Sequence, residues 1–175
     1  MSTRSLITIK RATDQYECIY CHSDGYLTYN GAMLLDHYND KEKVEKLLKL
    51  GNISILERNI DPDPNKPHSF DYDKRQDGVV VAYGRDRGEK EQESKTYNKQ
   101  QLLDYGWIEY VYIFDEDGKW KYMTPPNEKI KDVEEDLAKE YKHMGIRRPK
   151  GFYGFFTESS LREERKRQQQ EDSEM

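Results

Sequence analysis

This chain has little of the material from which protein interiors are usually built. Only 34% of its 175 residues are hydrophobic, whereas 36% are charged, and it contains only two tryptophans and five phenylalanines. No run approaches the roughly 18 apolar residues that a membrane helix requires, and residues 1–11 lack the apolar core of a signal peptide. These absences argue against membrane insertion and export, and they predict a cytoplasmic protein.

Cysteine is also scarce, with two residues in one short segment. Cys18, Cys21 and His22 match the haem-attachment pattern C-x-x-C-H, but that chemistry belongs to exported proteins. Residues three apart in a strand also point to opposite faces, and the chain has no second cysteine pair to complete the roughly four ligands of a structural zinc site. We therefore predict reduced thiols, no metal and no other cofactor, with Cys21 as a small buried hydrophobic residue.

The chain lacks the excess of Lys and Arg that phosphate backbones require. Its net charge is −5, so general nucleic-acid binding is not expected. Tyrosine is abundant, with 14 residues, and its apolar body and polar tip suit a half-buried sheet or a recognition surface. Charged residues gather at 85–95, 128–142 and 158–175, which leaves enough apolar residues elsewhere for one core.

Hydrophobic patterning predicts one α+β domain over residues 1–156 and a charged tail, helical or disordered, over 157–175. About five mostly antiparallel strands are expected to form one sheet, with helices packed on one face. The strands are expected at 5–10, 16–21, 78–83, 108–114 and 120–123. Residues 78–83 form the most continuous β-branched run, which is typical of a central strand.

Helical spacing predicts short helices at 32–38 and 99–105, and another helix between a cap at Asn39 and Gly51. A longer helix is expected to begin after Asn127 and to end at Gly145. Its apolar positions, spaced three or four apart, are Ile130, Val133, Leu137, Tyr141 and Met144. The basic and aromatic residues 147–156 are expected to dock on the sheet and close the core. The alternative is that they grip a partner or stack on bases.

Two loops carry the residues that best fit a functional site. His22 and Asp24 flank the end of the second strand, just before Gly25 and Tyr26, and a rigid sheet commonly positions functional groups on such loops. Asp24 would orient the His22 imidazole as a general base, a phosphate contact or a metal ligand. The alternative is that Asp24 only forms the turn, and His22 only bonds nearby backbone.

The second loop, GRDRG, follows the strand expected at 78–83. Arg85 and Arg87 present planar guanidinium groups suited to phosphate or carboxylate, and the flanking glycines allow close approach of a ligand. The alternative is a flexible charged loop in which Arg and Asp pair with each other. We expect both loops at one rim of the sheet, so that a single pocket would be lined by His22, Asp24, Tyr26, Arg85 and Arg87.

Residues 1–124 contain a run of short motifs. These are Thr3-Arg4-Ser5, Tyr20-Cys21-His22, Asp24-Gly25-Tyr26, Asn30-Gly31, Leu34-Leu35, His37-Tyr38 and the GRDRGE segment. In these motifs, the chain resembles a family of small proteins encoded by bacteriophages, prophages and related mobile elements. The family commonly has Trp after the His, where this chain has Ser23. The resemblance brings no settled activity and implies an accessory role in the host cytoplasm, where such proteins often inhibit or redirect host machinery.

Three functions follow from these patterns. The first is a non-catalytic phage-type accessory protein that binds a host protein, an anti-phage defence component or a small anionic, nucleotide-like ligand through residues 22–26 and 85–87. The second is a phosphoester hydrolase in which His22 is base or ligand, Asp24 orients it, and Arg85 or Arg87 holds the phosphate. The third is a structural or assembly protein, which would form a discrete homo-oligomer.

Overall fold

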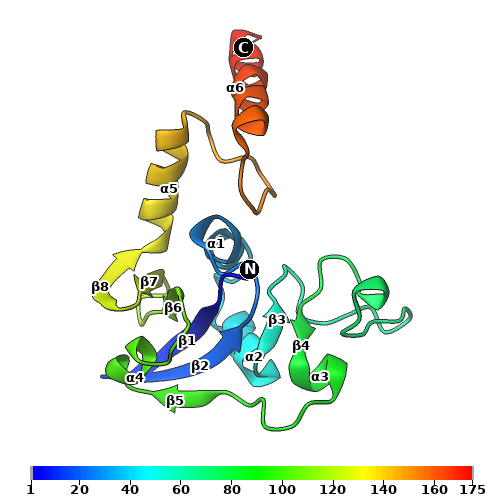
Figure 1. Ribbon diagram of the computed structural model, residues 1–175, viewed down its shortest axis with the longest axis vertical. Helices are drawn as coiled ribbons and strands as arrows, with labels where there is room; N and C mark the ends of the chain where they lie inside the picture. Colours follow the sequence, from blue (N-terminus) through cyan, green and yellow to red (C-terminus); the bar gives the residue numbers. More distant parts are fainter. Residues whose placement is uncertain (1, 175) are drawn as a thin grey trace.

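Two adjacent β-rich runs near the start of the chain form the centre of the sheet. In the computed structural model, which describes residues 2–174, strands β1 (Ser5–Ala12) and β2 (Gln15–Cys21) pair antiparallel. The turn between them includes Asp14, which has a φ of 56°. Strand β6 (Tyr110–Phe114) pairs in parallel with the other edge of β1. The N-terminal strand therefore lies in the interior of the sheet (Figure 1).

The complete sheet has eight strands in the order β4-β3-β2-β1-β6-β7-β8, and β5 pairs with β2 off this path. The remaining strands are β3 (Ile53–Ile55), β4 (Val81–Ala82), β5 (Lys95–Tyr97), β7 (Trp120–Thr124) and β8 (Asn127–Asp132). Five of the seven strand pairings are antiparallel. The predicted α+β class and mostly antiparallel sheet are confirmed. The predicted number of strands is too low. Strands β3 and β5 are too short to give a pattern, and β8 lies where a helix was expected.

Helices cover both faces of the sheet. The larger core lies under α1 (Ala32–His37), α2 (Lys41–Leu50) and α5 (Val133–Met144), each of which buries apolar side chains in it. The smaller core lies on the opposite face under α4 (Lys99–Leu103), where Leu102 is buried. The prediction that all helices pack on one face is therefore wrong for α4. The other helical segments are η1 (Leu27–Gly31), η2 (Tyr72–Lys74), α3 (Tyr83–Arg87) and α6 (Glu158–Ser173).

The alternation of side chains along β2 separates the two cysteines, as predicted. Cys18 lies in the smaller core and Cys21 in the larger core. Both thiols are free, and burial raises the pKa of Cys21 to about 11. Each cysteine is therefore a small, uncharged core residue.

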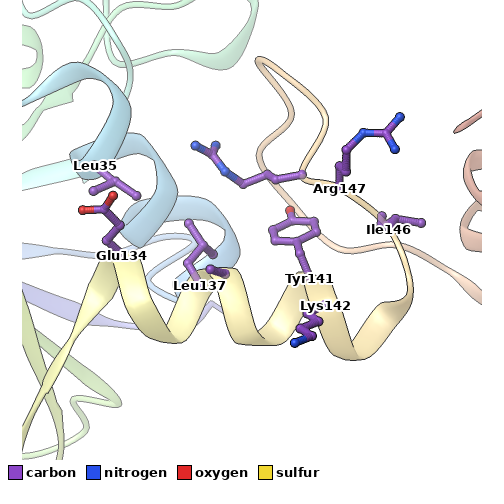
Figure 2. Close-up of a pocket in the computed structure, with 9 residues that line it drawn as sticks. Leu35, Glu134, Leu137, Tyr141, Lys142, Ile146 and Arg147 are labelled. Carbon is purple, nitrogen blue, oxygen red and sulfur yellow. The ribbon is translucent and has the colours of Figure 1, made fainter. Parts of the chain in front are cut away.

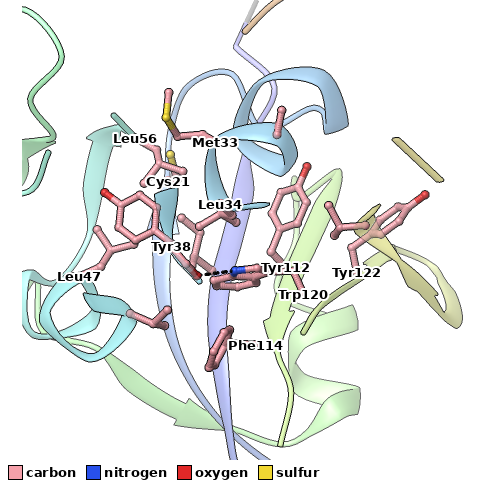
Figure 3. Close-up of a cluster of buried hydrophobic side chains, with 14 of the residues drawn as sticks. Cys21, Met33, Leu34, Tyr38, Leu47, Leu56, Tyr112, Phe114, Trp120 and Tyr122 are labelled. Atoms are coloured by element: carbon pink, nitrogen blue, oxygen red, sulfur yellow. Dashed lines mark hydrogen bonds between the residues drawn. The ribbon is translucent and has the colours of Figure 1, made fainter. Parts of the chain in front are cut away.

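Buried tyrosine and tryptophan side chains tie the loops around α1 to the sheet (Figure 3). The indole Nε1 of Trp120 donates a hydrogen bond of 2.9 Å to the carbonyl of Tyr38, and the Tyr38 hydroxyl donates one of 2.6 Å to the carbonyl of Glu57. The hydroxyl of Tyr112 donates a hydrogen bond of 2.6 Å to the carbonyl of Gly25. These bonds satisfy carbonyl groups that would otherwise be buried without a partner, and they fix the position of α1 over the sheet.

The β-branched run at 78–83 is not the central strand that its sequence predicts. It contributes the two-residue strand β4, which lies at one end of the sheet. Val79 and Val80 are buried nevertheless, because Asn59 forms a bridge with Val79 and packs its segment along this run. The continuous apolar run is therefore explained by packing against the segment around Asn59, and not by a central position in the sheet.

Two helix starts also differ from the predictions. The helix expected after Asn127 begins at Val133, where the Asp132 side chain accepts a hydrogen bond from the backbone N–H of Glu135. Residues 127–132 form the edge strand β8 instead, and Ile130 is exposed. The cap of α2 is Asp40, not Asn39. Both predicted helix ends are confirmed, since Gly51 follows α2 and Gly145 follows α5.

The charged tail is helical, and Figure 1 shows α6 projecting away from the sheet. Near its start, Leu161 packs against the larger core, and the rest of its attachment is polar. The side-chain amide of buried Gln168 bonds both the backbone N–H and the carbonyl of Arg147, and the Arg165 guanidinium donates two hydrogen bonds to the carbonyl of Met144, the last residue of α5. Among residues 2–174, no helix has both the length and the apolar character needed to cross a membrane.

Candidate binding groove

A groove lies between α1, α5 and the segment of residues 145–153. We call it the α1–α5 groove. It consists of two hollows of about 480 and 540 Å³, which adjoin because Leu35 and Arg148 line both. Figure 2 shows the first hollow, in which α5 carries most of the lining residues.

The floor of the α1–α5 groove is apolar. Leu137 and Tyr141 stand one turn apart on α5, on the same face of the helix (Figure 2), and both are largely buried. Leu35 of α1 and Ile146 complete this floor. The spacing of four residues follows from the helical repeat, which places positions i and i+4 on one face. The same stripe that anchors α5 to the core therefore also forms the base of the groove.

The rim of the groove is basic, although the whole chain has a net charge of −5. The basic side chains that line the two hollows are Lys142, Arg147, Arg148 and Lys150, and the acidic ones are Asp36 and Glu134. Arg148 pairs with Asp36, and Arg147 lies within ion-pair distance of Glu171 and Asp172 of α6. The lining charges without an ion pair among residues 2–174 are therefore Lys142, Lys150 and Glu134. The groove is therefore a locally positive region of an acidic protein.

A hydrogen-bonded network lines the second hollow and includes Arg148, which also lines the first. Arg148 donates hydrogen bonds of 2.8 and 2.5 Å to the two carboxylate oxygens of Asp36. The Tyr153 hydroxyl donates one of 2.8 Å to Asp36 Oδ2 and lies 2.8 Å from His37 Nε2. Because that hydroxyl proton is directed to Asp36, we assign the proton of neutral His37 to Nε2, which donates to the Tyr153 oxygen.

The charges of this network are fixed by its surroundings. Burial opposes ionisation of Asp36, but the hydrogen bonds from Arg148 and Tyr153 outweigh it, so the pKa of Asp36 is lowered. Burial lowers the pKa of His37 and favours the neutral imidazole. Asp36 remains a carboxylate and holds the Arg148 guanidinium, so the network supports the groove by fixing residues 148–153 against α1.

Replacing Asp36 with asparagine tests this support. The change is expected to lower the free energy of unfolding by about 1–2 kcal/mol near pH 7, because a half-buried guanidinium loses its charged acceptor. The folded-state pKa of Asp36 lies below its ordinary value of 3.8. Its contribution is therefore present above that pH and disappears as the pH falls through the folded-state pKa. Urea unfolding across this pH range measures the difference from the unmodified protein.

Asp73→Asn is the matched control for Asp36→Asn, because Asp73 is exposed and accepts no side-chain hydrogen bond among the described residues. It is expected to change the free energy of unfolding by less than about 0.5 kcal/mol. Equal losses from the two substitutions would contradict the role given to Asp36.

The turn at residues 22–26, which the sequence predicts to be functional, makes hydrogen bonds with adjacent segments of the sheet. The backbone N–H of His22 bonds the carbonyl of Ile53 at 3.1 Å, and its Nδ1 lies 2.8 Å from the Tyr20 hydroxyl. Asp24 has a φ of 56°, and burial raises its pKa. Within residues 2–174 no hydrogen bond joins His22 to Asp24. The ring of Tyr26 stacks on Phe155, with 3.8 Å between centroids, so the turn contacts the C-terminal aromatic segment.

Most of the GRDRG segment belongs to the short helix α3 and is not the flexible loop of the alternative interpretation, although its Arg85 and Asp86 pair with each other as that interpretation expected. Arg85 donates hydrogen bonds of 2.6 Å to the carbonyl of Ile60 and 2.7 Å to that of Val80, and it pairs with Asp86. Arg87 lies over the ring of Phe70, 4.7 Å from its centroid. In the described part of the chain, no hydrogen bond or ion pair connects Arg85 or Arg87 to residues 22–26. The shared pocket of these five residues stays a prediction.

Sequence reasoning missed the network around Asp36. The sequence places His37 only in a short motif, and Arg148 and Tyr153 only in a segment that is expected to dock on the core. That docking is confirmed, because Tyr153 and Phe156 pack against the larger core. The available signal was the mixture of basic and aromatic residues at 147–156, which indicates a segment able both to pack and to carry charge.

Comparisons of the chain with protein family models, with curated proteins and with solved structures return no match. No relative or structural neighbour therefore assigns an activity to the α1–α5 groove. The resemblance to phage-encoded proteins stays a prediction from the motifs.

Proposed function

We propose that this chain is a phage-type accessory protein of the host cytoplasm, which binds and modulates a host or anti-phage defence protein through the α1–α5 groove. The observation that carries the proposal is an apolar floor with a basic rim, in a protein that is acidic overall. Apolar area supplies affinity, and a charged rim supplies selectivity and orientation.

The shape of the groove supports a protein partner over a small ligand. Its two hollows lie side by side and share Leu35 and Arg148. They therefore offer an elongated surface that runs from α5, in the first hollow, to the end of α1 and residues 148–153, in the second. A compact nucleotide-like ligand is usually enclosed in one pocket. An elongated apolar surface with polar edges is the form in which proteins commonly bind segments of other proteins.

Binding is also better supported than catalysis. The hydrolase hypothesis requires Arg85 or Arg87 to hold a phosphate. The Arg85 guanidinium already binds the carbonyls of Ile60 and Val80 and the carboxylate of Asp86, and that of Arg87 lies over the ring of Phe70. In the groove, Asp36 and Arg148 satisfy each other. The hydrolase and the assembly protein stay as alternative hypotheses, which assays of nucleotide turnover and of oligomeric state address directly.

Ala138→Glu tests the proposal. Ala138 is exposed on α5 and lines the first hollow, so glutamate at this position fills the groove while keeping a good helix former. In affinity purification of the full chain from host lysate, we expect a retained partner whose recovery falls about tenfold or more with Ala138→Glu, because a bound partner would bury an unpaired charge.

Lys139→Gln is the matched control for Ala138→Glu. Lys139 is exposed on α5 but does not line the groove, and its loss changes the net charge by the same amount. Recovery with Lys139→Gln should equal that of the unmodified chain. Equal recovery with both variants, or no partner retained by the unmodified chain, would overturn the proposal.

A further inference from the structure

We infer that the occupant of the α1–α5 groove is an acidic amphipathic helix of the partner protein, and that the acidic end of α6 competes with it for Arg147. This inference rests on the proposed function and specifies the chemistry of the partner. Three observations carry it: unpaired cations at the rim, an apolar stripe of helical spacing at the floor, and an acidic helix end that already contacts the rim.

The first observation is the state of the rim lysines. Lys142 and Lys150 are exposed and line the first and second hollow, respectively. Within residues 2–174, neither has a carboxylate within ion-pair distance, whereas Arg148 is paired with Asp36. A partner with carboxylates on both flanks of an apolar stripe supplies the charges that these lysines lack.

The second observation is the geometry of the floor. Leu137 and Tyr141 form its base and are only 2% and 3% exposed. Leu35 and Ala138 are the more accessible apolar residues of the first hollow. A helix laid in the groove presents its own apolar side chains at intervals of three and four residues, so that they can contact Leu35 and Ala138. An extended single strand of nucleic acid would present phosphates to the rim but no apolar side chains to this floor. The floor therefore favours a helix over another polyanion.

The third observation is the contact made by α6. The Arg147 guanidinium lies 3.2 Å from a carboxylate oxygen of Asp172 and 3.6 Å from one of Glu171. A further hollow of about 350 Å³ separates α5 from α6, and it shares Lys142, Ile146 and Arg147 with the groove. The acidic end of α6 therefore neutralises a cation of the groove rim, and an acidic partner must displace it or do without Arg147.

The probe is a synthetic helical peptide of about four turns, with a leucine stripe and glutamates on both flanks. A second peptide carries the same stripe with lysines in place of glutamates. In fluorescence anisotropy at low salt with the full chain, we expect the glutamate peptide to bind at least about tenfold more tightly than the lysine peptide. Equal binding of the two peptides, or binding of neither, would overturn the inference.

Paired substitutions locate the site. Lys142→Gln with Lys150→Gln should weaken binding of the glutamate peptide about three- to tenfold, as expected for two exposed ion pairs. The control is Lys129→Gln with Lys139→Gln, which removes two exposed charges away from the groove and should leave binding unchanged. Equal effects of the two pairs would overturn the inference. Tighter binding of a single-stranded oligonucleotide, or self-association lost with the groove pair, would also overturn it.

Competition by α6 predicts a change of the opposite sign. Glu171→Gln with Asp172→Asn should strengthen binding of the glutamate peptide about two- to fivefold, because Arg147 becomes available. Unchanged or weaker binding would contradict the competition. The peptide experiment tests this inference and the lysate experiment tests the proposed function, so either can fail while the other succeeds. Partner recovery that depends on Ala138 without any preference for the glutamate peptide keeps the proposed function and removes this inference. A preference for the glutamate peptide, without partner recovery that depends on Ala138, removes the proposed function.

Discussion

Gly51→Ala is expected to lower the free energy of unfolding by about 3 kcal/mol or more. Gly51 ends α2 with a φ of 84° and a ψ of −160°, a conformation that only glycine adopts readily. A Cβ atom there would lie 2.3 Å from the backbone carbonyl oxygen of Gln92. The clash cannot be relieved by a side-chain rotation, so either the α2–β3 junction or the segment around Gln92 must move. Urea unfolding followed by circular dichroism measures the loss.

Gly88→Ala measures the cost of the ordinary left-handed conformation in the absence of a clash. Gly88 also has a positive φ, of 74°, but no atom lies within 4 Å of the position that its Cβ would take. Its replacement is expected to cost only about 1–2 kcal/mol. Equal losses at Gly51 and Gly88 would show that the contact with Gln92 has no energetic weight.

Trp120→Ala is expected to lower the free energy of unfolding by about 3–5 kcal/mol, the range for large aromatic residues removed from a core. Trp120 is 3% exposed and packs among the residues of the larger core. Its removal leaves a cavity and also deprives the buried carbonyl of Tyr38 of its hydrogen bond from the indole. The end of α1 would lose its direct link to β7.

The second tryptophan is a natural control for Trp120. Trp107 is 87% exposed, so Trp107→Ala should change the free energy of unfolding by less than about 0.5 kcal/mol. Because the chain has only two tryptophans, the fluorescence of the Trp107→Ala variant reports on Trp120 alone. Comparable destabilisation by the two substitutions would contradict the core assignment of Trp120.

The parts of the fold that the sequence predicts are those with local signals. The hairpins β1–β2 and β6–β7 and the glycines after α2 and α5 each depend on a few neighbouring residues. Strand β8 lacks such a signal, because an edge strand with an exposed face needs no apolar alternation. Its residue Ile130 also lies three positions before Val133, a spacing that resembles a helix. Local patterns therefore gave the wrong secondary structure at the edge of the sheet.

The site was harder to predict because its residues come from distant parts of the chain. Asp36 and Arg148 are separated by 112 positions, and no local pattern links them. Arg85 shows the opposite difficulty. A guanidinium in a glycine-rich segment has the same donors whether it binds a ligand or backbone carbonyls of the protein itself, as Arg85 does with Ile60 and Val80. Only the folded arrangement distinguishes these two uses.

The interior position of β1 affects the protein while it is still being made. One edge of β1 is covered as soon as β2 emerges from the ribosome, since Ser5 pairs with Cys21. The other edge pairs Ser5 with Tyr110. Its backbone N–H and C=O groups therefore lack their strand partner until most of the chain has been synthesised. Bare strand edges promote association between nascent chains. Any truncation that stops before β6 would make that temporary exposure permanent.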